Sequence, residues 1–597
     1  MANCVPEREK IAREYRWNLE DIYASEQDWE RDFQELEQRA GNFAKFSGKL
    51  ADPKALLEAL QEYEAMEKLL DKLFPYARMR RDEDNRVDRY QALTSRAQSL
   101  LVKFSTATSF LTPELIRLPK EFLASVLSDE AFEDFRVLLR EIDRNREHTL
   151  SVEEERIIAM AGEMSAAPDT VYSMLTDADM KFPSVRNEEG ESVELTQSNY
   201  IPLMMSKNRE VRSAAFNALY ETYQSFSATI PAIYEASIKA DMFAARTARH
   251  ASCLEAALFP DDVPVSVYDN LVQSVRGHLP MLNRFVACNG KRIGVKPMRM
   301  IDVYVPAVEG FDIRLPFDEA YKLVVDALGV LGKDYQELLE TARHEGWIDA
   351  FENAGKSSGA YSWGSYCSHP FVLLNYKENL DSLLTIAHEM GHSLHTYFSN
   401  QAQPFLAAQY SLFVAEVAST TNEILVLFRL MDRYQDDPKA QAFLTYHLLD
   451  SFRSTVFRQT MFAEFERSAH EMAERGEALT AQNLNAVYGA LNAQYYTSVE
   501  QDKLISLEWM RIPHFYRAFY VYKYATGFSA AMAIAVAIRD QGAPAVERYR
   551  KFLSLGCSLP PLEALKVAGV DMRNPQSVES ALEEFDRLVE RYEALTE

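Results

Sequence analysis

SLLTIAHEMGHSLHTYF, which spans residues 382–398, is an apolar stretch with a helical period. A helix that is apolar on nearly every face is buried, and polar side chains within it need partners. His388 and His392 are four residues apart, so both imidazoles lie on one helix face about one turn from each other. The stretch therefore predicts a buried helix whose two histidines bind one metal ion.

The full pattern, His388 and Glu389 followed by His392, is typical of zinc hydrolases, in which the histidines bind the metal and the glutamate acts on water. Glu389 is accordingly the predicted general base. The competing interpretation is a pair of core histidines satisfied by hydrogen bonds, with Glu389 paired to a nearby base. That interpretation suits a single histidine better than the complete pattern on a buried helix, which favours the metal.

A catalytic zinc needs a third protein ligand and one open position. One class of zinc peptidases has a histidine six residues after the second ligand, but here that position is Phe398, so this class is excluded. His395 lies one turn past His392, yet three ligands along one helix would crowd the metal. We therefore expect His395 in the wall of the site.

The next predicted helix offers a better third ligand. It carries a narrow polar stripe on an otherwise apolar surface, made of Glu416, Ser419, Thr420 and Glu423. Buried carboxylates on such a stripe are costly unless they are paired or bind a metal. We predict that Glu416 is the third ligand and that Glu423 holds a ligand histidine in the required tautomer. The alternative, a solvent-facing stripe, is disfavoured by Leu427 on the same face.

A further group is HFYRAFYVYKYATG at residues 514–527, in which four tyrosines follow a histidine. Aromatic residues at this density more often belong to a core than to a catalytic site. Each phenol nevertheless needs a hydrogen-bond partner, and phenol and imidazole donors can stabilise the oxyanion that a zinc hydrolase forms. The segment is therefore a candidate part of the site.

Outside these motifs the chain is predicted to be mostly helical. Helices are expected to begin at Asn18, at Pro53 with Asp52 as N-cap, at Ser151 with a capping box, at about Asn208, and repeatedly after Asn379. Short β regions are expected at 182–195, as a hairpin with its turn near Gly190, at 298–306 and at 359–376. The hairpin is the predicted boundary between an N-terminal helical lobe, residues 1–200, and a catalytic domain, residues 201–597.

The composition limits the possible partners. The chain has 597 residues, and 64 Lys+Arg against 89 Asp+Glu give a net charge of -25. So acidic a chain is a poor partner for nucleic acid or for an anionic membrane surface. The cysteines are odd in number and widely spaced, which disfavours a disulfide framework; they are Cys4, Cys253, Cys288, Cys367 and Cys557. Because the N-terminus has no apolar signal segment, we predict a cytoplasmic protein.

Four segments together are similar to the oligoendopeptidase F branch of the M3, thimet-oligopeptidase-like, zinc metallopeptidases. The segments are HEMGHSLH, FVAEVASTTNE, GAYSWGSYCSHPFVLLNY and IPHFYRAFYVYKYATG. They run from about Gly359 to Gly527, and weaker similarity extends over most of the chain. The resemblance implies a mainly α fold of two helical lobes around a deep substrate channel, with a small β-sheet near the zinc-binding helix.

The resemblance also implies a cofactor and site residues. It implies one Zn²⁺ per chain, and its ligands would be His388, His392 and Glu416, with Glu389 as the general base. Substrate and oxyanion contacts would come from His514, Tyr520 and Tyr522, while Tyr516 and Tyr524 remain open. The strand near Gly359 would pair with the peptide backbone by strand addition.

The expected activity is hydrolysis of internal bonds in short oligopeptides, by a monomer or a small homo-oligomer. One alternative is a dipeptidyl carboxypeptidase, which would need an anchor for a terminal carboxylate that the sequence does not reveal. The other alternative is a non-catalytic peptide-binding protein with a structural zinc. Structural zinc sites have four protein ligands, whereas the sequence offers three good ones, which favours catalysis.

Overall fold

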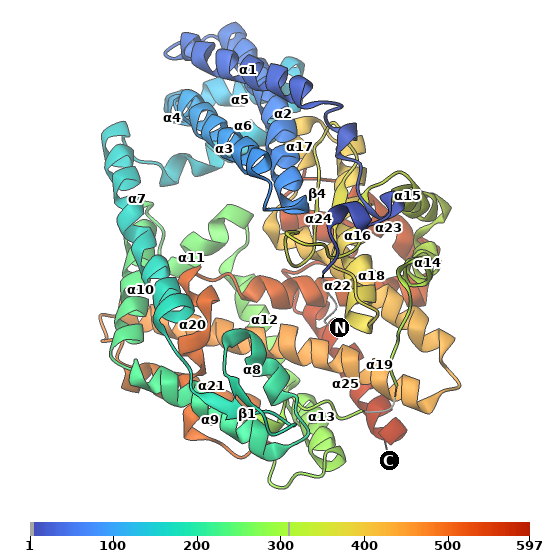
Figure 1. The fold of residues 1–597 in the computed structure, drawn as a ribbon. Helices are drawn as coiled ribbons and strands as arrows, with labels where there is room; N and C mark the ends of the chain where they lie inside the picture. Colours follow the sequence, from blue (N-terminus) through green and yellow to red (C-terminus); the bar gives the residue numbers. More distant parts are fainter. Residues whose placement is uncertain (1–4, 309–310, 597) are drawn as a thin grey trace. The chain divides into compact units, whose positions relative to one another are not determined.

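A computed structural model describes residues 5–308 and 311–596 of the chain. The fold is mainly helical, as predicted, and the described residues form one sheet of two strands and one of three (Figure 1). The chain divides into two compact units of three segments each. Unit 1 comprises Met1–Thr149, Asp312–Val426 and Ile534–Gly569; unit 2 comprises Leu150–Phe311, Leu427–Ala533 and Val570–Glu597.

Unit 1 contains the N-terminal helices and the helix of the first motif. Its helices are α1 (Glu26–Asn42), α2 (Pro53–Glu83), α3 (Asp88–Thr108), α4 (Leu111–Arg117), α5 (Lys120–Ser128), α6 (Arg136–Arg144), α14 (Phe317–Leu328), α15 (Lys333–His344), α16 (Leu380–Ala402), α17 (Phe405–Ala408), α23 (Ala543–Leu553) and α24 (Pro561–Val567). Two further helices contain a unit boundary, α18 (Leu412–Arg433) and α22 (Tyr522–Gln541). Figure 1 shows α1, α2 and α3 side by side, and they pack against one another.

The sheet of unit 1 links these N-terminal helices to α16. Its strands are β3 (Ile348–Asp349), β4 (Tyr361–Trp363) and β5 (Phe371–Leu373), in the order β3-β5-β4. Strand β5 is parallel to β3 and antiparallel to β4, so β4 is an edge strand. Phe371 and Leu373 belong to the same hydrophobic core as the helices between Trp17 and Ile142. Strand β4 packs on α16, where the Ser362 and Ser393 hydroxyls lie 2.8 Å apart.

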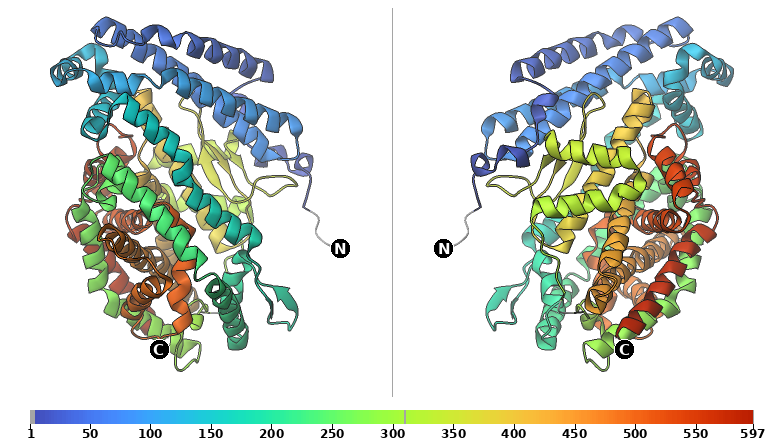
Figure 2. Two further views of the ribbon diagram at one scale, coloured as in Figure 1. Left: turned by 90° about the vertical axis from the view of Figure 1, so that its left-hand side faces the viewer. Right: turned by 90° about the vertical axis from the view of Figure 1, so that its right-hand side faces the viewer.

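Unit 2 is a second helical assembly with a small hairpin. Its helices are α7 (Val152–Ser173), α8 (Gln197–Met204), α9 (Arg209–Ser225), α10 (Thr229–Thr247), α11 (Cys253–Leu258), α12 (Val265–Gly277), α13 (Leu279–Arg292), α19 (Pro438–Phe452), α20 (Arg458–Glu474), α21 (Ala481–Tyr495) and α25 (Gln576–Thr596). Strands β1 (Ser184–Arg186) and β2 (Ser192–Glu194) form an antiparallel hairpin that projects from these helices in both views of Figure 2. Gly190 supplies the positive φ of +80° in its turn.

Several predicted elements are confirmed. Helix α2 begins at Pro53 with the Asp52 side chain accepting from Lys54 N–H, and α7 begins with a capping box at Ser151. The hairpin and the two strands within 359–376 are also present. The predicted helix at Asn18 is only one short 3-10 turn, Leu19–Asp21. Strand β3 was not predicted, because two residues are too short for a sequence pattern.

The predicted strand at 298–306 is wrong. The segment forms a 3-10 turn, Met300–Asp302, and a single bridge residue. Asp302 is 1% exposed and receives hydrogen bonds from two arginines: Arg212 Nη2 at 2.6 Å and Arg209 Nη2 at 2.7 Å. Pairing this buried carboxylate fixes the turn and outweighs the β-propensity of the neighbouring valines.

The predicted division at residue 200 does not coincide with the compact units. The first boundary lies between Thr149 and Leu150, and the hairpin lies inside unit 2. No helix among the described residues is both long and apolar enough to cross a membrane. Four cysteines are free thiols, whereas Cys4 lies outside the described residues.

Candidate metal centre

Helix α16 presents the two histidines of the motif. The Asn379 side chain caps it by accepting a hydrogen bond from Ser382 N–H at 2.8 Å. From this start the helix runs without a break through His388 and His392. Their ring centroids are 4.8 Å apart, and their Nε2 atoms approach to 3.2 Å. The i, i+4 spacing therefore brings two potential ligand atoms to one point, as the sequence predicts.

Helix α18 brings Glu416 to the same point. Its Oε2 atom lies 3.2 Å from His388 Nε2 and 3.5 Å from His392 Nε2. Ligand atoms about 2.0–2.1 Å from a tetrahedral zinc are about 3.3 Å from one another, so the triangle of these three atoms has the size that zinc requires. The donor set, two imidazoles and one carboxylate, also suits zinc. These are the three residues that the sequence analysis names as ligands, and they form one cluster.

Gly391 allows α16 and α18 to approach this closely. A Cβ at this position would lie 2.6 Å from the Cα of Ser419 and 2.8 Å from the carbonyl oxygen of Ala418. Real Cβ atoms do not come so near to backbone atoms, so only glycine fits between the two helices. The role of Gly391 could not be predicted from the sequence, because the spacing within the motif says nothing about the partner helix.

Glu423 orients one of the ligands, as expected. Its Oε1 atom lies 2.5 Å from His388 Nδ1, which leaves Nε2 free to face the cluster. Burial lowers the pKa of His388, but its hydrogen bonds to Glu416 and Glu423 outweigh that effect and raise the pKa to about 10. The hydrogen bonds with His388 and His392 in turn lower the pKa of Glu416. The carboxylates thus make the imidazoles more basic, which strengthens them as metal ligands.

Glu389 is in a different environment from the other two carboxylates. It is 6% exposed, and burial raises its pKa although the neighbouring histidines act in the opposite direction. A carboxylate with a raised pKa next to a metal centre is suited to accept a proton from water and to release it again. This environment matches the role that the sequence assigns to Glu389.

The exposure of Glu416 differs from the sequence expectation. The stripe on α18 was expected to be buried, yet 51% of the Glu416 side chain and 31% of the Glu423 side chain are exposed. The residues that follow Glu416, Val417 and Ala418, are buried as expected. The stripe therefore opens to solvent at its metal end, and a catalytic metal needs such an open side.

His395 does not join the cluster. Its ring stacks on Tyr410 with centroids 3.7 Å apart, and Phe552 lies at 5.3 Å on the same ring. Burial lowers the pKa of His395 to about 3, so this histidine is neutral. It therefore packs the ligand helix, α16, against Tyr410 and Phe552.

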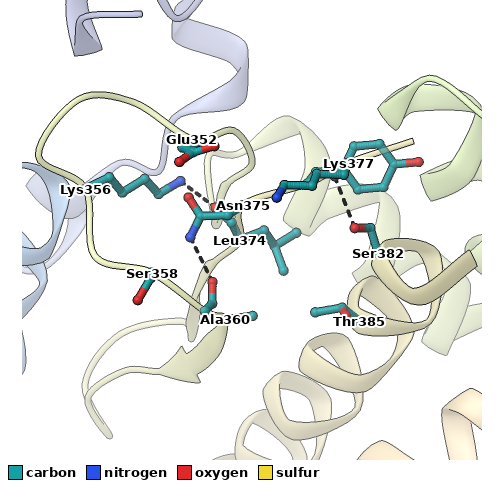
Figure 3. Close-up of a pocket in the computed structure, with 11 residues that line it drawn as sticks. Glu352, Lys356, Ser358, Ala360, Leu374, Asn375, Lys377, Ser382 and Thr385 are labelled. Atoms are coloured by element: carbon teal, nitrogen blue, oxygen red, sulfur yellow. Dashed lines mark hydrogen bonds between the residues drawn. The ribbon is translucent and has the colours of Figure 1, made fainter. Parts of the chain in front are cut away.

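A pocket lies next to the metal cluster in unit 1 (Figure 3). It has a volume of about 410 Å³ and is lined by Glu352, Lys356, Ser358, Gly359, Ala360, Leu374, Asn375, Tyr376, Lys377, Ser382 and Thr385. Asn375 Nδ2 shapes one wall by donating to the carbonyl oxygen of Gly359 at 2.9 Å. Thr385 precedes His388 by three residues on α16, so the pocket begins about one helical turn from the ligands.

The tyrosine segment lies in unit 2, where the structure brings three of its side chains together. Tyr524 Oη is 3.4 Å from His514 Nε2, and the Tyr520 ring lies 6.2 Å from that of His514 and 5.4 Å from that of Tyr524. Burial and the charges of Arg517 and Arg458 lower the pKa of His514, so its ring is neutral at neutral pH.

The remaining two tyrosines of the segment pack against tyrosines of other helices. Tyr522 is 0% exposed, its ring lies 5.3 Å from that of Tyr268, and burial raises its pKa well above the ordinary value. Tyr516 stacks on Tyr172 with centroids 4.3 Å apart. The hydroxyl of Tyr524, whose role the sequence left open, therefore faces the His514 imidazole. The predicted Tyr522 packs on Tyr268 instead.

The chain matches two family models, Peptidase family M3 over residues 202–584 and Oligopeptidase F over residues 114–182. It is 40% identical to Oligopeptidase PepF of Bacillus subtilis, over 100% of this chain and 89% of that protein. It is 39% identical to Group B oligopeptidase PepB of Streptococcus agalactiae, over 98% and 97% of the two chains. The crystal structure of oligoendopeptidase-F from Enterococcus faecium is similar with a TM-score of 0.74 and 34% identity, over 96% of this chain and 99% of that one.

Proposed function

The chain belongs to peptidase family M3, in its oligopeptidase F branch, and we propose that it is a zinc-dependent endopeptidase that cleaves internal bonds of short peptides. The observation that carries the proposal is the triangle of ligand atoms from His388, His392 and Glu416, with edges of 3.2, 3.2 and 3.5 Å. Those residues would hold one Zn²⁺ per chain. When bound, zinc supplies a Lewis acid that polarises the scissile carbonyl and makes a water molecule more acidic.

Glu389 is the proposed general base and acid. It would take a proton from the attacking water and later pass it to the nitrogen of the leaving amine. Its burial beside the ligand histidines raises its pKa toward the range in which a carboxyl group can do both. Glu423 would keep His388 in the tautomer whose Nε2 binds the metal.

Hydrogen-bond donors for the developing oxyanion are proposed to come from His514, Tyr520 and Tyr522. Tyr524 joins this proposal, because its hydroxyl contacts His514. The neutral state of His514 suits a role as donor without a change of charge. Tyr520 and Tyr524 are better placed than Tyr522, whose side chain is fully buried.

The peptide is proposed to bind along β4. This strand has one edge paired with β5, and no strand of the described residues pairs with its other edge, which could form backbone hydrogen bonds with an extended peptide. Gly359, just before the strand, and Thr385, just before the ligands, both line the pocket of Figure 3. A peptide on this edge would pass the pocket and reach the metal cluster in extended form.

Two alternatives are kept as outcomes of the test. A dipeptidyl carboxypeptidase would require a free C-terminus, and a binding protein with a structural zinc would not turn over. The partly exposed third ligand favours a metal with an open side over a closed structural site. The cytoplasmic location and the monomer or small homo-oligomer are further proposals that rest on the sequence.

The test is cleavage of an internally quenched peptide of about ten residues with both ends blocked, before chelation, after chelation, and after return of zinc. The proposal expects internal cleavage that stops on chelation and returns with zinc. Cleavage of an unblocked peptide alone would favour the exopeptidase. Absence of cleavage of both peptides, with zinc bound, would favour the binding protein.

A further inference from the structure

His514 and Tyr520 are connected by a sharp turn with an unusual backbone. Tyr520 N–H donates to the carbonyl oxygen of Arg517 at 3.2 Å, which closes a four-residue turn. The third residue of this turn, Phe519, has a φ of +54°. Glycine is usual at this position of such a turn, and a bulky side chain in the left-handed region persists only where its surroundings hold it there.

Glu466 on α20 holds the strained residue. Its Oε1 atom accepts a hydrogen bond from Phe519 N–H at 2.7 Å, and its side chain is fully buried. Its Oε2 atom has no hydrogen-bond partner among the described residues. Burial raises the pKa of the Glu466 carboxyl well above its ordinary value.

Packing on the aromatic ring completes the arrangement. The ring of His470, one turn further along α20, lies 4.6 Å from that of Phe519. His470 is itself fixed, because Nδ1 lies 2.9 Å from the Glu466 carbonyl oxygen and Nε2 lies 3.2 Å from Asp241 Oδ2. Residues on one face of α20 thus hold both the ring and the backbone amide of Phe519 in position.

A leucine or methionine in place of Glu466 would fill a similar volume without the cost of burying a carboxyl group that has one oxygen unpaired. The contribution of the carboxyl therefore lies in the single bond it makes to the turn. We infer that Glu466 is a positioning residue, which fixes the turn at Phe519 and thereby the placement of Tyr520 relative to His514. The inference deepens the proposed function and rests on it.

The experiment compares Glu466→Met with Glu466→Gln in the full-length, zinc-loaded protein, with the blocked quenched peptide as substrate. Glutamine keeps an oxygen acceptor for Phe519 N–H, so kcat should stay within about twofold of wild type. Methionine removes the acceptor, and kcat should fall by about 10- to 100-fold because the donors are displaced. KM and the zinc content per chain should not change, since Glu466 is neither a proposed metal ligand nor a residue of β4.

Glu464→Met is the matched control for a merely structural effect. Glu464 is a buried carboxylate on the same helix, and it accepts from Tyr495 Oη at 2.7 Å and from Arg276 but does not contact the turn. Its loss should lower the melting temperature and leave kcat of the folded protein unchanged. If Glu466→Met has wild-type kcat, or if Glu464→Met loses as much kcat as Glu466→Met, the inference is overturned.

A second change keeps every side chain, in case Glu466→Met does not fold. Incorporation of the α-hydroxy analogue of phenylalanine at 519 replaces the amide N–H by an ester oxygen and removes the same hydrogen bond. A comparable loss of kcat supports the inference, and an unchanged kcat overturns it. If the wild-type protein shows no chelator-sensitive cleavage, the proposed function and this inference are both overturned. If wild-type cleavage is normal and only the variants behave otherwise than expected, the inference alone fails.

Discussion

Replacing Gly391 by alanine tests how the ligand helix and the third ligand are kept together. The new Cβ would lie 2.6 Å from Ser419 Cα, 2.8 Å from Ala418 O and 2.9 Å from Ser419 N. All three are backbone atoms of α18, so no rotation of a side chain relieves the overlap. Carbon atoms in ordinary contact are about 3.5–4.0 Å apart, so α18 must move away from α16 by about 1 Å.

That displacement acts directly on the metal cluster. Glu416 lies three residues before Ser419 on α18 and moves with it. Metal–ligand distances vary by only about 0.2 Å in real sites, so a shift of about 1 Å removes or distorts the third bond. We expect zinc affinity to fall by about 100-fold. The free energy of unfolding of the metal-free protein should fall by about 2 kcal/mol. Overpacking destabilises the helix contact by about 3 kcal/mol, and the higher helix propensity of alanine offsets about 1 kcal/mol of this.

Zinc affinity is measured by dialysis against a competing chelator followed by metal analysis, and stability by denaturant unfolding of the metal-free protein. Gly162→Ala is the matched control, because this helical glycine has no heavy atom within 4 Å of a new Cβ. The control should bind zinc like wild type and gain slightly in stability. A Gly391→Ala protein that binds zinc within about threefold of wild type would refute the reasoning, because the helix contact would then not set the ligand triangle.

Three further predictions concern single side chains. Glu389→Gln should retain zinc, and its kcat should fall about 10²- to 10⁴-fold, which is the usual contribution of a general base. Near-normal turnover with bound zinc would reject the assignment. Glu423→Gln should lower zinc affinity about 10- to 100-fold, because His388 loses the carboxylate that orients it. The affinity is measured by metal analysis at equal free zinc, and an unchanged affinity would reject this role of Glu423. His278 lies 2.9 Å from both Asp586 Oδ2 and Glu579 Oε2, and these hydrogen bonds raise its pKa against the effect of burial. His278 should contribute roughly 1 kcal/mol to the free energy of unfolding, measured against His278→Gln by denaturant unfolding. This contribution should be full below the unfolded pKa of about 6.5 and should disappear as the pH rises through the folded pKa. A contribution that grows with pH would contradict this.

The parts of the site that the sequence predicts are those encoded by local spacing. The two histidines and Glu389 follow from the period of one helix, and Glu416 from a polar stripe on the next. Both helices are where the patterns place them, and Glu423 contacts His388 as expected. Local patterns suffice here because each helix is long, apolar and strongly periodic.

The parts that the sequence does not predict depend on contacts between distant segments. The need for Gly391 arises from the backbone of α18, and the 3-10 turn at Met300–Asp302 arises from two arginines of α9. The half-exposed state of Glu416 depends on which segments cover the end of α18, which a helical period does not encode. Likewise, the turn between His514 and Tyr524 contains Phe519 with a φ of +54°, which residue spacing does not encode.

The most direct test of the central claim is a titration of the metal-free protein with zinc, in which bound zinc and peptide cleavage are measured on the same samples. The account predicts that the rate of internal cleavage of the blocked peptide rises linearly with bound zinc and reaches its plateau at one zinc per chain. His388→Ala, in the same titration, should bind no zinc at that affinity and show no cleavage. Cleavage by the zinc-free protein, or full activity of His388→Ala, would contradict the account.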